Sequence, residues 1–182
     1  MGRVAGPQTE EASTMVFSLE NGTFTQHQAF RTMGTADIDF MATVDGNVFM
    51  FVAEERNSSQ ATEIMSRIMV WDKELRQFAV FQDIPTDGAK HGKFFMKGND
   101  IWLAVSNYGD MKKGRVEAKS KIYKFVFESQ RFVEQAEIDT FGASGIQVRF
   151  PSLFPVRYTT PNLANFEFLS FSTHSMERSR HE

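Results

Sequence analysis

A repeat of 54 residues constrains the fold of this chain more than any other feature of its sequence. The stretch WDKELRQFAVFQDIPTDGA begins at residue 71, and the similar stretch FVFESQRFVEQAEIDTFGA begins at residue 125. Aromatic residues recur with the same period, at Phe17, Trp71 and Phe125 and, seven residues later, at Phe24, Phe78 and Phe132. Self-similarity at a fixed period indicates a fold in which one supersecondary unit is repeated.

A Thr-x-Gly motif recurs with this period. Its threonines and glycines are Thr32 and Gly34, Thr86 and Gly88, and Thr140 and Gly142; Ala89 and Ala143 follow the last two. Glycine permits a positive φ at a tight crossing, and threonine can bond the local backbone. These residues are therefore interpreted as structural, with ligand binding as the alternative.

Each unit reads as four short strands. The first alternates between apolar and polar residues and ends at the Thr-x-Gly motif, and the second ends in a Gly-Asn turn, at 46–47 or 98–99. The third is a continuous apolar run, 48–53 or 101–105, and a polar loop, 54–65 or 106–119, separates it from the fourth. Continuous apolar strands are buried on both faces, so Trp102 is expected in the core.

Four antiparallel strands per unit, with the units arranged radially, define a β-propeller blade. The sequence thus predicts an all-β propeller segment at 14–150, with blades at about 24–72 and 78–127 and a partial blade from 132. A strand at about 14–19 would close a preceding blade. Residues 1–13 are expected to be disordered, and the proline-containing tail, 151–182, diverges from the pattern. A β-sandwich of two repeats is the alternative.

Composition and motifs exclude several kinds of function. A net charge of -3 and a pI of about 5.8 argue against nucleic acid and anionic membranes, and no apolar run is long enough to insert into a membrane. The absence of cysteine excludes disulfides, zinc–thiolate sites and cysteine nucleophiles. No catalytic motif is present, so the chain is not expected to be an enzyme. A propeller hydrolase is the alternative, and it would need acidic residues at a channel mouth on several blades.

A few residues are candidates for other chemistry. Asp37 and Asp39 could offer oxygens to calcium, although calcium needs six to eight oxygen ligands and the other units supply no carboxylate there. No other cofactor is expected. Asn21 and Asn57 begin Asn-x-Ser/Thr triplets, which accept glycans if the chain enters the secretory pathway.

The repeat resembles the EAR repeat, also called EPTP, of the leucine-rich glioma-inactivated proteins and of the thrombospondin-type laminin G domain and EAR repeat protein. The resemblance covers about 15–150, and in the second unit it rests on Phe78, Gln82, Ile84, Thr86, Gly88, Ala89, Phe94, Phe95, Gly98, Asn107, Ile122, Tyr123 and Phe125. The family's Asp after Gly-Ala is present only as Asp37, and its Trp is replaced by Ile38 and Gly92.

This resemblance implies a seven-bladed, non-catalytic propeller that is secreted and binds a cell-surface receptor or an adhesion protein. Too few blades are present to close such a ring, so the chain is expected to be a piece of a larger protein or an incomplete gene model. A piece with no independent function is the further alternative.

Strands of a blade alternate in direction, so the Thr-x-Gly crossings and the long polar loops should emerge on one face. The Gly-Asn hairpins and the links at 72–77 and 126–131 should lie on the opposite face. Binding residues usually sit on long loops of a rigid scaffold, and Tyr and Arg are favoured at hot spots. Tyr108 and Arg115 are therefore predicted to anchor the partner.

Expressed alone, the chain is expected to be marginally stable or to self-associate. Its terminal blades would expose apolar faces and unpaired strand edges. Light scattering across a concentration series tests this expectation. A monodisperse monomer with a cooperative thermal transition would contradict it.

Overall fold

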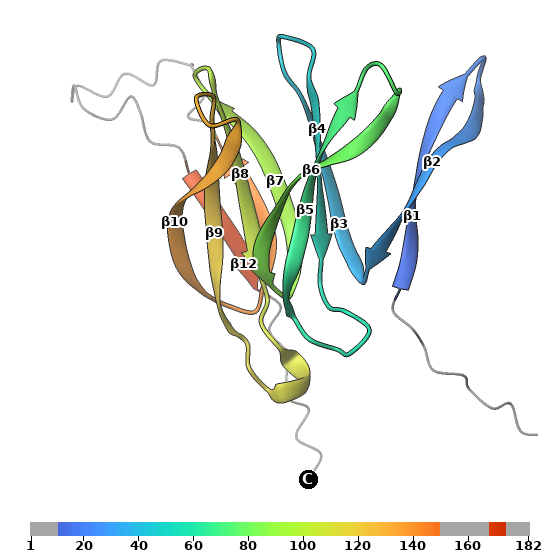
Figure 1. Ribbon diagram of the computed structural model, residues 1–182. Coiled ribbons are helices and arrows are strands. Elements are labelled where there is room, and N and C mark those ends of the chain that lie inside the picture. The colour runs from blue at the N-terminus through green and yellow to red at the C-terminus, as the bar shows by residue number, and fades with distance from the viewer. Residues whose placement is uncertain (1–10, 150–167, 174–182) are drawn as a thin grey trace, which may run out of the picture.

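The computed structural model describes residues 11–149 and 168–173, and these residues form strands and one short 3-10 turn (Figure 1). The elements are β1 (Glu11–Glu20), β2 (Thr23–Met33), β3 (Thr35–Ala42), β4 (Val48–Glu54), β5 (Glu63–Asp72), β6 (Gln77–Asp87), β7 (Ala89–Lys97), β8 (Asp100–Asn107), η1 (Met111–Lys113), β9 (Glu117–Val126), β10 (Arg131–Phe141), β11 (Ala143–Arg149) and β12 (Phe168–Thr173).

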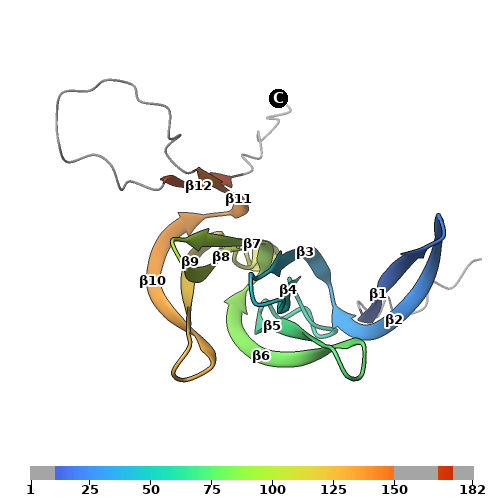
Figure 2. The same ribbon diagram turned by 90° about the horizontal axis from the view of Figure 1, so that it is seen from above.

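Two four-stranded antiparallel sheets form the centre of the structure, with the strand orders β3-β4-β5-β6 and β7-β8-β9-β10. A two-stranded sheet flanks them on each side, β1-β2 and β11-β12. Seen from above, β3, β7 and β11 follow one another, while β6 and β10 curve away from them (Figure 2). Each complete sheet is a propeller blade with its first strand innermost, and the expected all-β propeller architecture is confirmed.

Each sheet begins one strand later than the unit defined from the sequence. The sheets span 35–87 and 89–141, whereas the sequence pattern predicts units at 24–72 and 78–127. The difference arises because the first strand of each unit turns back onto the last strand of the preceding unit and pairs with it, as β6 pairs with β5. β1 begins at Glu11 rather than at about 14, and the remaining N-terminal residues and most of the tail lie outside the described residues.

The first unit also departs from a strict period of 54. Strands β1 and β2 are joined by a two-residue turn at Asn21 and Gly22, whereas four residues join β5 and β6. Leu19 therefore pairs with Phe24 as Trp71 pairs with Phe78. The sequence alignment of Phe17 with Trp71 is wrong by two residues, because the shorter turn shifts β1 along β2.

Strand β4 is buried on both faces, as its continuous apolar run predicts. Phe49, Phe51 and Ile68 of the first blade pack against Phe94, Leu103, Tyr123, Phe125 and Phe132 of the second. On the opposite face, Met50, Val52, Met69 and Phe78 pack against Val16 and Phe30 of the β1-β2 sheet. Two hydrophobic layers, one on either side of this blade, hold three successive sheets together.

Trp102 does not occupy the core position expected for it. It lies on the other face of β8, is only partly buried, and stacks on Phe95 at 6.2 Å between ring centroids. The register of the hairpin sets this face, because Trp102 pairs with Phe95 as Phe49 pairs with Met41 in the first blade. Phe94 pairs with Leu103, so Leu103 rather than Trp102 takes the place that Met50 has in β4.

Gly92 stands where the family pattern has Trp, and the packing explains its size. A Cβ at this position would lie 2.0 Å from Cδ1 of Phe51 in the neighbouring blade. The aromatic ring that the pattern places here is thus supplied across the interface by Phe51. The departure from the family pattern is thus compensated between two blades, since the small Gly92 leaves room for the large Phe51 side chain.

A glutamine joins the outer strands of successive sheets at two equivalent places. The Gln28 side chain donates to the Phe78 carbonyl at 2.9 Å and accepts from the Phe78 N–H at 2.8 Å. Gln82 makes the same pair of bonds to Phe132, both at 2.9 Å. The third unit has Ala136 at this position, so the outer strand of the second blade lacks this clamp.

Replacing Gln82 by Ala should lower the free energy of unfolding by about 1–3 kcal/mol, because two backbone groups of Phe132 lose their partner. Gln135→Ala is the matched control. Gln135 is exposed and bonds only the Val133 and Glu134 carbonyls beside it, so its loss should cost no more than about 0.5 kcal/mol. Urea unfolding of the two variants measures the difference, and equal midpoints would contradict the clamp.

Candidate functional site

The inner strands β3 and β7 are joined by carboxylates that accept backbone N–H groups. Asp37 accepts from the Gly92 N–H at 3.1 Å, and its carboxylate lies 2.8 Å from the His91 Nδ1. Asp39 accepts from the Phe94 N–H at 2.7 Å and from the Lys93 Nζ at 2.7 Å. These four contacts tie the first blade to the second along the side where the inner strands meet.

The same contacts bear on the calcium hypothesis for Asp37 and Asp39. Oxygens of both carboxylates are engaged by protein donors, and calcium requires six to eight oxygen ligands. Within the described part of the chain, no three His, Cys, Asp or Glu side chains are grouped so that they could hold a metal ion. The arrangement suits a blade-to-blade contact.

The repeated threonines lie in buried hydrogen-bond networks at the ends of the blades. Thr86 bonds the Ser66 hydroxyl at 2.9 Å and donates to the Ile64 carbonyl at 3.1 Å. Thr140 does the same with Ser120, at 2.8 Å, and with the Ala118 carbonyl, at 3.1 Å. In the first unit Thr14 takes the place of the serine and donates to Thr32.

The repeated glycines make the crossing from each outer strand to the next inner strand. Gly34, Gly88 and Gly142 have φ values of 56°, 61° and 57°. A Cβ on Gly88 would lie 2.5 Å from the Gly109 carbonyl oxygen, so the long loop after β8 approaches this crossing closely. Ala89 and Ala143, which follow the glycines, are fully buried.

Both long loops emerge at one end of the sheets, together with the glycine crossings (Figure 1). This end, residues 55–62 and 108–116 with the crossings, is called the loop end. Backbone bonds hold the loops to the crossings, from Glu55 to Gly34, from Gly109 to Asp87 and from Gly142 to Val116. The prediction that long loops and crossings share one face is confirmed.

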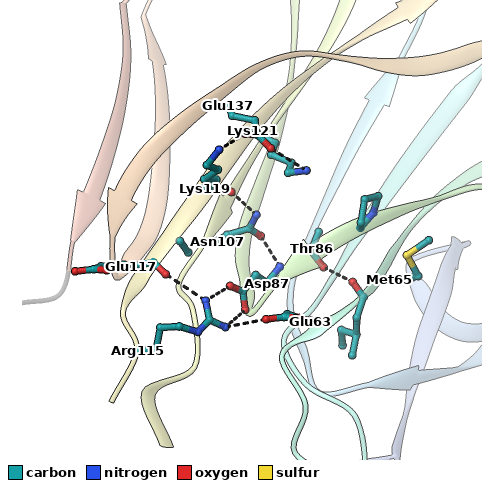
Figure 3. Close-up of a pocket in the computed structure, with 13 residues that line it drawn as sticks. Glu63, Met65, Thr86, Asp87, Asn107, Arg115, Glu117, Lys119, Lys121 and Glu137 are labelled. Carbon is teal, nitrogen blue, oxygen red and sulfur yellow. Dashed lines mark hydrogen bonds and ion pairs between the residues drawn. The ribbon is translucent and has the colours of Figure 1, made fainter. Parts of the chain in front are cut away.

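A charged cleft of about 540 Å³ opens between the two blades near the loop end (Figure 3). Arg115 is its central side chain. It contacts both carboxylate oxygens of Asp87, at 2.5 and 2.9 Å, reaches Glu63 at 3.4 Å and donates to the Glu117 carbonyl at 3.2 Å. The side-chain bond with Asp87 raises the pKa of Arg115.

The far wall of this cleft carries a lysine–glutamate group on β9 and β10. Lys119 contacts Glu137 at 2.5 Å, and Lys121 contacts Glu134 at 2.8 Å. The hydrogen bond with Glu137 raises the pKa of Lys119, and the same bond lowers the pKa of Glu137. The cleft therefore presents paired charges of both signs.

Asn107 links the cleft to the blade behind it. Its amide accepts from the Asp87 N–H at 3.2 Å and donates to the Lys119 carbonyl at 2.7 Å. The first blade has Glu54 in this place, which pairs with Arg67. Burial raises the pKa of Glu54, although the Arg67 bond opposes this.

The two predicted anchors differ in their exposure. Tyr108 is 8% exposed, with its ring 3.3 Å from the point where a Cβ on Gly142 would lie and the Lys90 Nζ 5.7 Å from its centroid. Arg115 keeps 38% of its side chain accessible at the cleft. Tyr108 is thus packed inside the loop end, and of the two residues Arg115 is the one that faces solvent.

Sequence reasoning missed a groove at the opposite end, where the Gly-Asn hairpins lie. This end is called the hairpin end, and the groove has a volume of about 500 Å³. Apolar side chains dominate its lining, among them Phe49, Phe81, Phe125 and Phe127, and Asn47, Asn99 and Gln130 lie at its rim. The sequence did contain one indication of this groove: the second Gly-Asn hairpin, at 98–99, comes two residues earlier in its unit than the first hairpin, at 46–47. A shorter hairpin covers less of the hydrophobic layer between the two blades.

The glycosylation triplets lie at opposite ends. Asn21 is exposed in the β1–β2 turn. Asn57 lies in the loop after β4, and its amide oxygen accepts from the Ser59 and Ala61 N–H groups, both at 3.0 Å. Among the described residues, no helix is long and apolar enough to cross a membrane.

The architecture and the repeated contacts define a propeller-type repeat protein. Residues 77–126 match the EPTP domain, so the resemblance to the EAR/EPTP repeat family is confirmed. No curated protein matches the chain significantly. The family is typically extracellular, and its domain suggests a protein-binding, non-enzymatic repeat module.

Glu55 provides a pH-dependent contact at the loop end. Burial opposes ionisation, but hydrogen bonds from Lys90 and Arg56 outweigh it and lower the pKa of Glu55 below its usual 4.5. Such a carboxylate stabilises the fold fully above its unfolded pKa and loses this contribution as the pH falls through its folded pKa.

Replacing Lys90 by Met should therefore make stability fall less steeply as the pH drops below about 4.5. Lys112→Met is the matched control, since Lys112 bonds the uncharged amide of Gln60 and should leave the pH dependence unchanged. Unfolding midpoints at several pH values between neutral and acidic measure the slopes. Identical slopes for Lys90→Met and the unmodified chain would contradict the assignment.

Proposed function

We propose that this chain acts as a non-catalytic, extracellular binding module that docks a cell-surface receptor or adhesion protein on its loop end. The observation that carries the proposal is the pair of long loops held against rigid crossings beside a charged cleft. Loops on a rigid scaffold are the common location of binding residues. The EPTP match supports protein binding as the class of activity.

Arg115 is the residue best placed to contact the partner. Its guanidinium is already oriented by Asp87 and Glu63 and is still accessible at the cleft. A side chain that is ordered before binding loses less conformational freedom when the complex forms. Arginine is also enriched among the residues that dominate interface energetics.

The charges around Arg115 favour a polar partner surface. Glu63 on β5 of the first blade and Glu117 and Lys119 on β9 of the second blade are all exposed around the cleft. Paired charges of both signs contribute mainly to specificity and to the association rate. A partner that presents carboxylates and amines in the complementary order would satisfy this surface, in keeping with a reversible receptor contact.

Catalysis receives no support from the described residues. A hydrolase would need unengaged acids near the axis on several blades, and the acids on the inner strand β3, Asp37 and Asp39, accept bonds from β7. The corresponding residues of β7 are His91 and Lys93. The binding role is therefore preferred over the hydrolase alternative.

Binding of the labelled chain to intact cells, before and after surface proteolysis, tests the proposal. Arg115→Glu should weaken binding about tenfold or more, as loss of a hot-spot arginine does. Arg131→Glu is the matched control, because Arg131 is exposed at the hairpin end. Circular dichroism checks that both variants remain folded.

Loop exchange distinguishes the two ends of the molecule. Replacing 55–62 or 108–116 by a short Gly-Ser linker should remove cell binding. If these exchanges leave binding intact while Phe127→Lys or Asn99→Ala at the hairpin groove abolishes it, the partner docks on the other end. Absence of binding to untreated cells would contradict the receptor-docking role itself.

A further inference from the structure

The hairpin between β1 and β2 turns through only two residues, Asn21 and Gly22. Their φ values, 51° and 80°, have the positive sign that a type I′ turn requires, and Asn-Gly is a preferred sequence for such turns. This dipeptide occurs once in the whole sequence. Turn geometry thus accounts for a pair of residues that is also chemically reactive.

Both residues of this turn are open to solvent. Asn21 and Gly22 are exposed, and a Cβ built on Gly22 would meet no atom within 4 Å. Within the described part of the chain, neither the Asn21 side chain nor the Gly22 N–H forms a hydrogen bond. The side-chain amide carbon and the backbone nitrogen that follows it are therefore both free to react.

A blade on either side does not cover a turn at this place. The first blade packs against the β1-β2 sheet on one face and against the second blade on the other. Its equivalent turn, residues 73–76, is nevertheless exposed throughout. Asn21 and Gly22 therefore stay accessible whether or not further blades of the polypeptide flank the β1-β2 sheet.

We propose that Asn21 is a modification site at which two reactions compete for one amide nitrogen. In the first, spontaneous deamidation, the Gly22 backbone nitrogen loses its proton to solvent and attacks Cγ of Asn21. The bond from Cγ to Nδ2 breaks, Nδ2 takes a proton from solvent and leaves as ammonia, and a five-membered succinimide forms. Water then opens this ring at either carbonyl, which gives aspartate or isoaspartate.

The second reaction attaches an N-linked glycan to the same Nδ2. Asn21, Gly22 and Thr23 form an acceptor triplet for this glycan in the secretory pathway. A glycan is bulky and is carried by the nitrogen that deamidation must expel, so it protects the turn. This half of the inference rests on the extracellular location in the proposed function, whereas deamidation needs only water.

Deamidation changes the hairpin in two ways. A new carboxylate appears beside Glu20, which is itself exposed. Isoaspartate also adds one carbon to the backbone of a turn that pairs Glu20 with Thr23 and Leu19 with Phe24. Because the turn fixes the register of a hairpin, the isoaspartate form should be less well ordered in β1 and β2.

Peptide mass mapping of the full chain made in the bacterial cytosol, where no such glycan is attached, tests the first reaction. During incubation at mildly alkaline pH, the Asn21 peptide should give two products of equal mass, because ring opening yields both aspartate and isoaspartate.

Asn99 is the internal control for this experiment. It is also exposed in a two-residue hairpin, and its side chain forms no bond to the described residues, but Asp100 follows it. Asn21 should convert about tenfold or more faster, because glycine places no Cβ beside the attacking nitrogen. Equal rates for the two asparagines, or a single product from Asn21, would overturn the proposal.

Two substitutions separate the reactions. Gly22→Ser keeps the acceptor triplet and adds a Cβ, so it should slow deamidation about tenfold and leave glycosylation intact. Thr23→Val removes the acceptor hydroxyl and keeps Asn-Gly, so it should abolish the glycan and leave the deamidation rate unchanged. Circular dichroism checks that both variants fold. The opposite pattern in the two variants would contradict the assignment.

The full chain secreted from mammalian cells behind an added signal peptide tests the protection. Chains with a glycan on Asn21 should deamidate there about tenfold or more slowly than secreted Thr23→Val, which carries none. Absence of a glycan on Asn21, or equal rates with and without it, would overturn the competition. None of these measurements involves receptor binding, so they are distinguishable from a failure of the docking function.

Discussion

The two-sided burial of strand β4 is the constraint on which the rest of the structure depends. Its side chains alternate between two hydrophobic layers, with Phe49 and Phe51 in one layer and Met50 and Val52 in the other. Neither layer can form unless a sheet lies on each side, so a single blade cannot be stable alone. The inter-blade glutamine and aspartate contacts set the angle and register of sheets that this burial already holds together.

Differences among the units matter as much as their similarities. The inner carboxylates and the outer glutamines join the first blade to its neighbours, but His91, Lys93 and Ala136 replace them on the second blade. A contact between blades that has both the inner aspartates and the outer glutamine is bonded to backbone groups at its inner and outer strands. A contact that lacks these residues relies on side-chain packing. The contact between the two complete blades therefore carries both kinds of backbone bond.

The loop end combines rigidity with variation. The crossings are nearly identical in the three units, with buried threonines and glycines of positive φ, because they connect one sheet to the next in a narrow space. The long loops bonded to them differ in sequence and present the charged side chains around Arg115. Repeated geometry beneath variable loops is suited to recognition of a partner protein.

The sequence by itself determined the repeat, the four-stranded unit, the doubly buried third strand and the loop end, because periodicity and hydrophobic alternation are local properties. Only the tertiary structure decided which strands share a sheet, where Trp102 packs and whether Tyr108 is accessible. These depend on strand register: the alignment with a two-residue gap places Trp102 at the position of Met50, whereas the paired strands place it one residue away, at the position of Phe49, and a one-residue shift moves a side chain to the other face of its sheet. Local patterns carry no information on that shift until neighbouring strands pair.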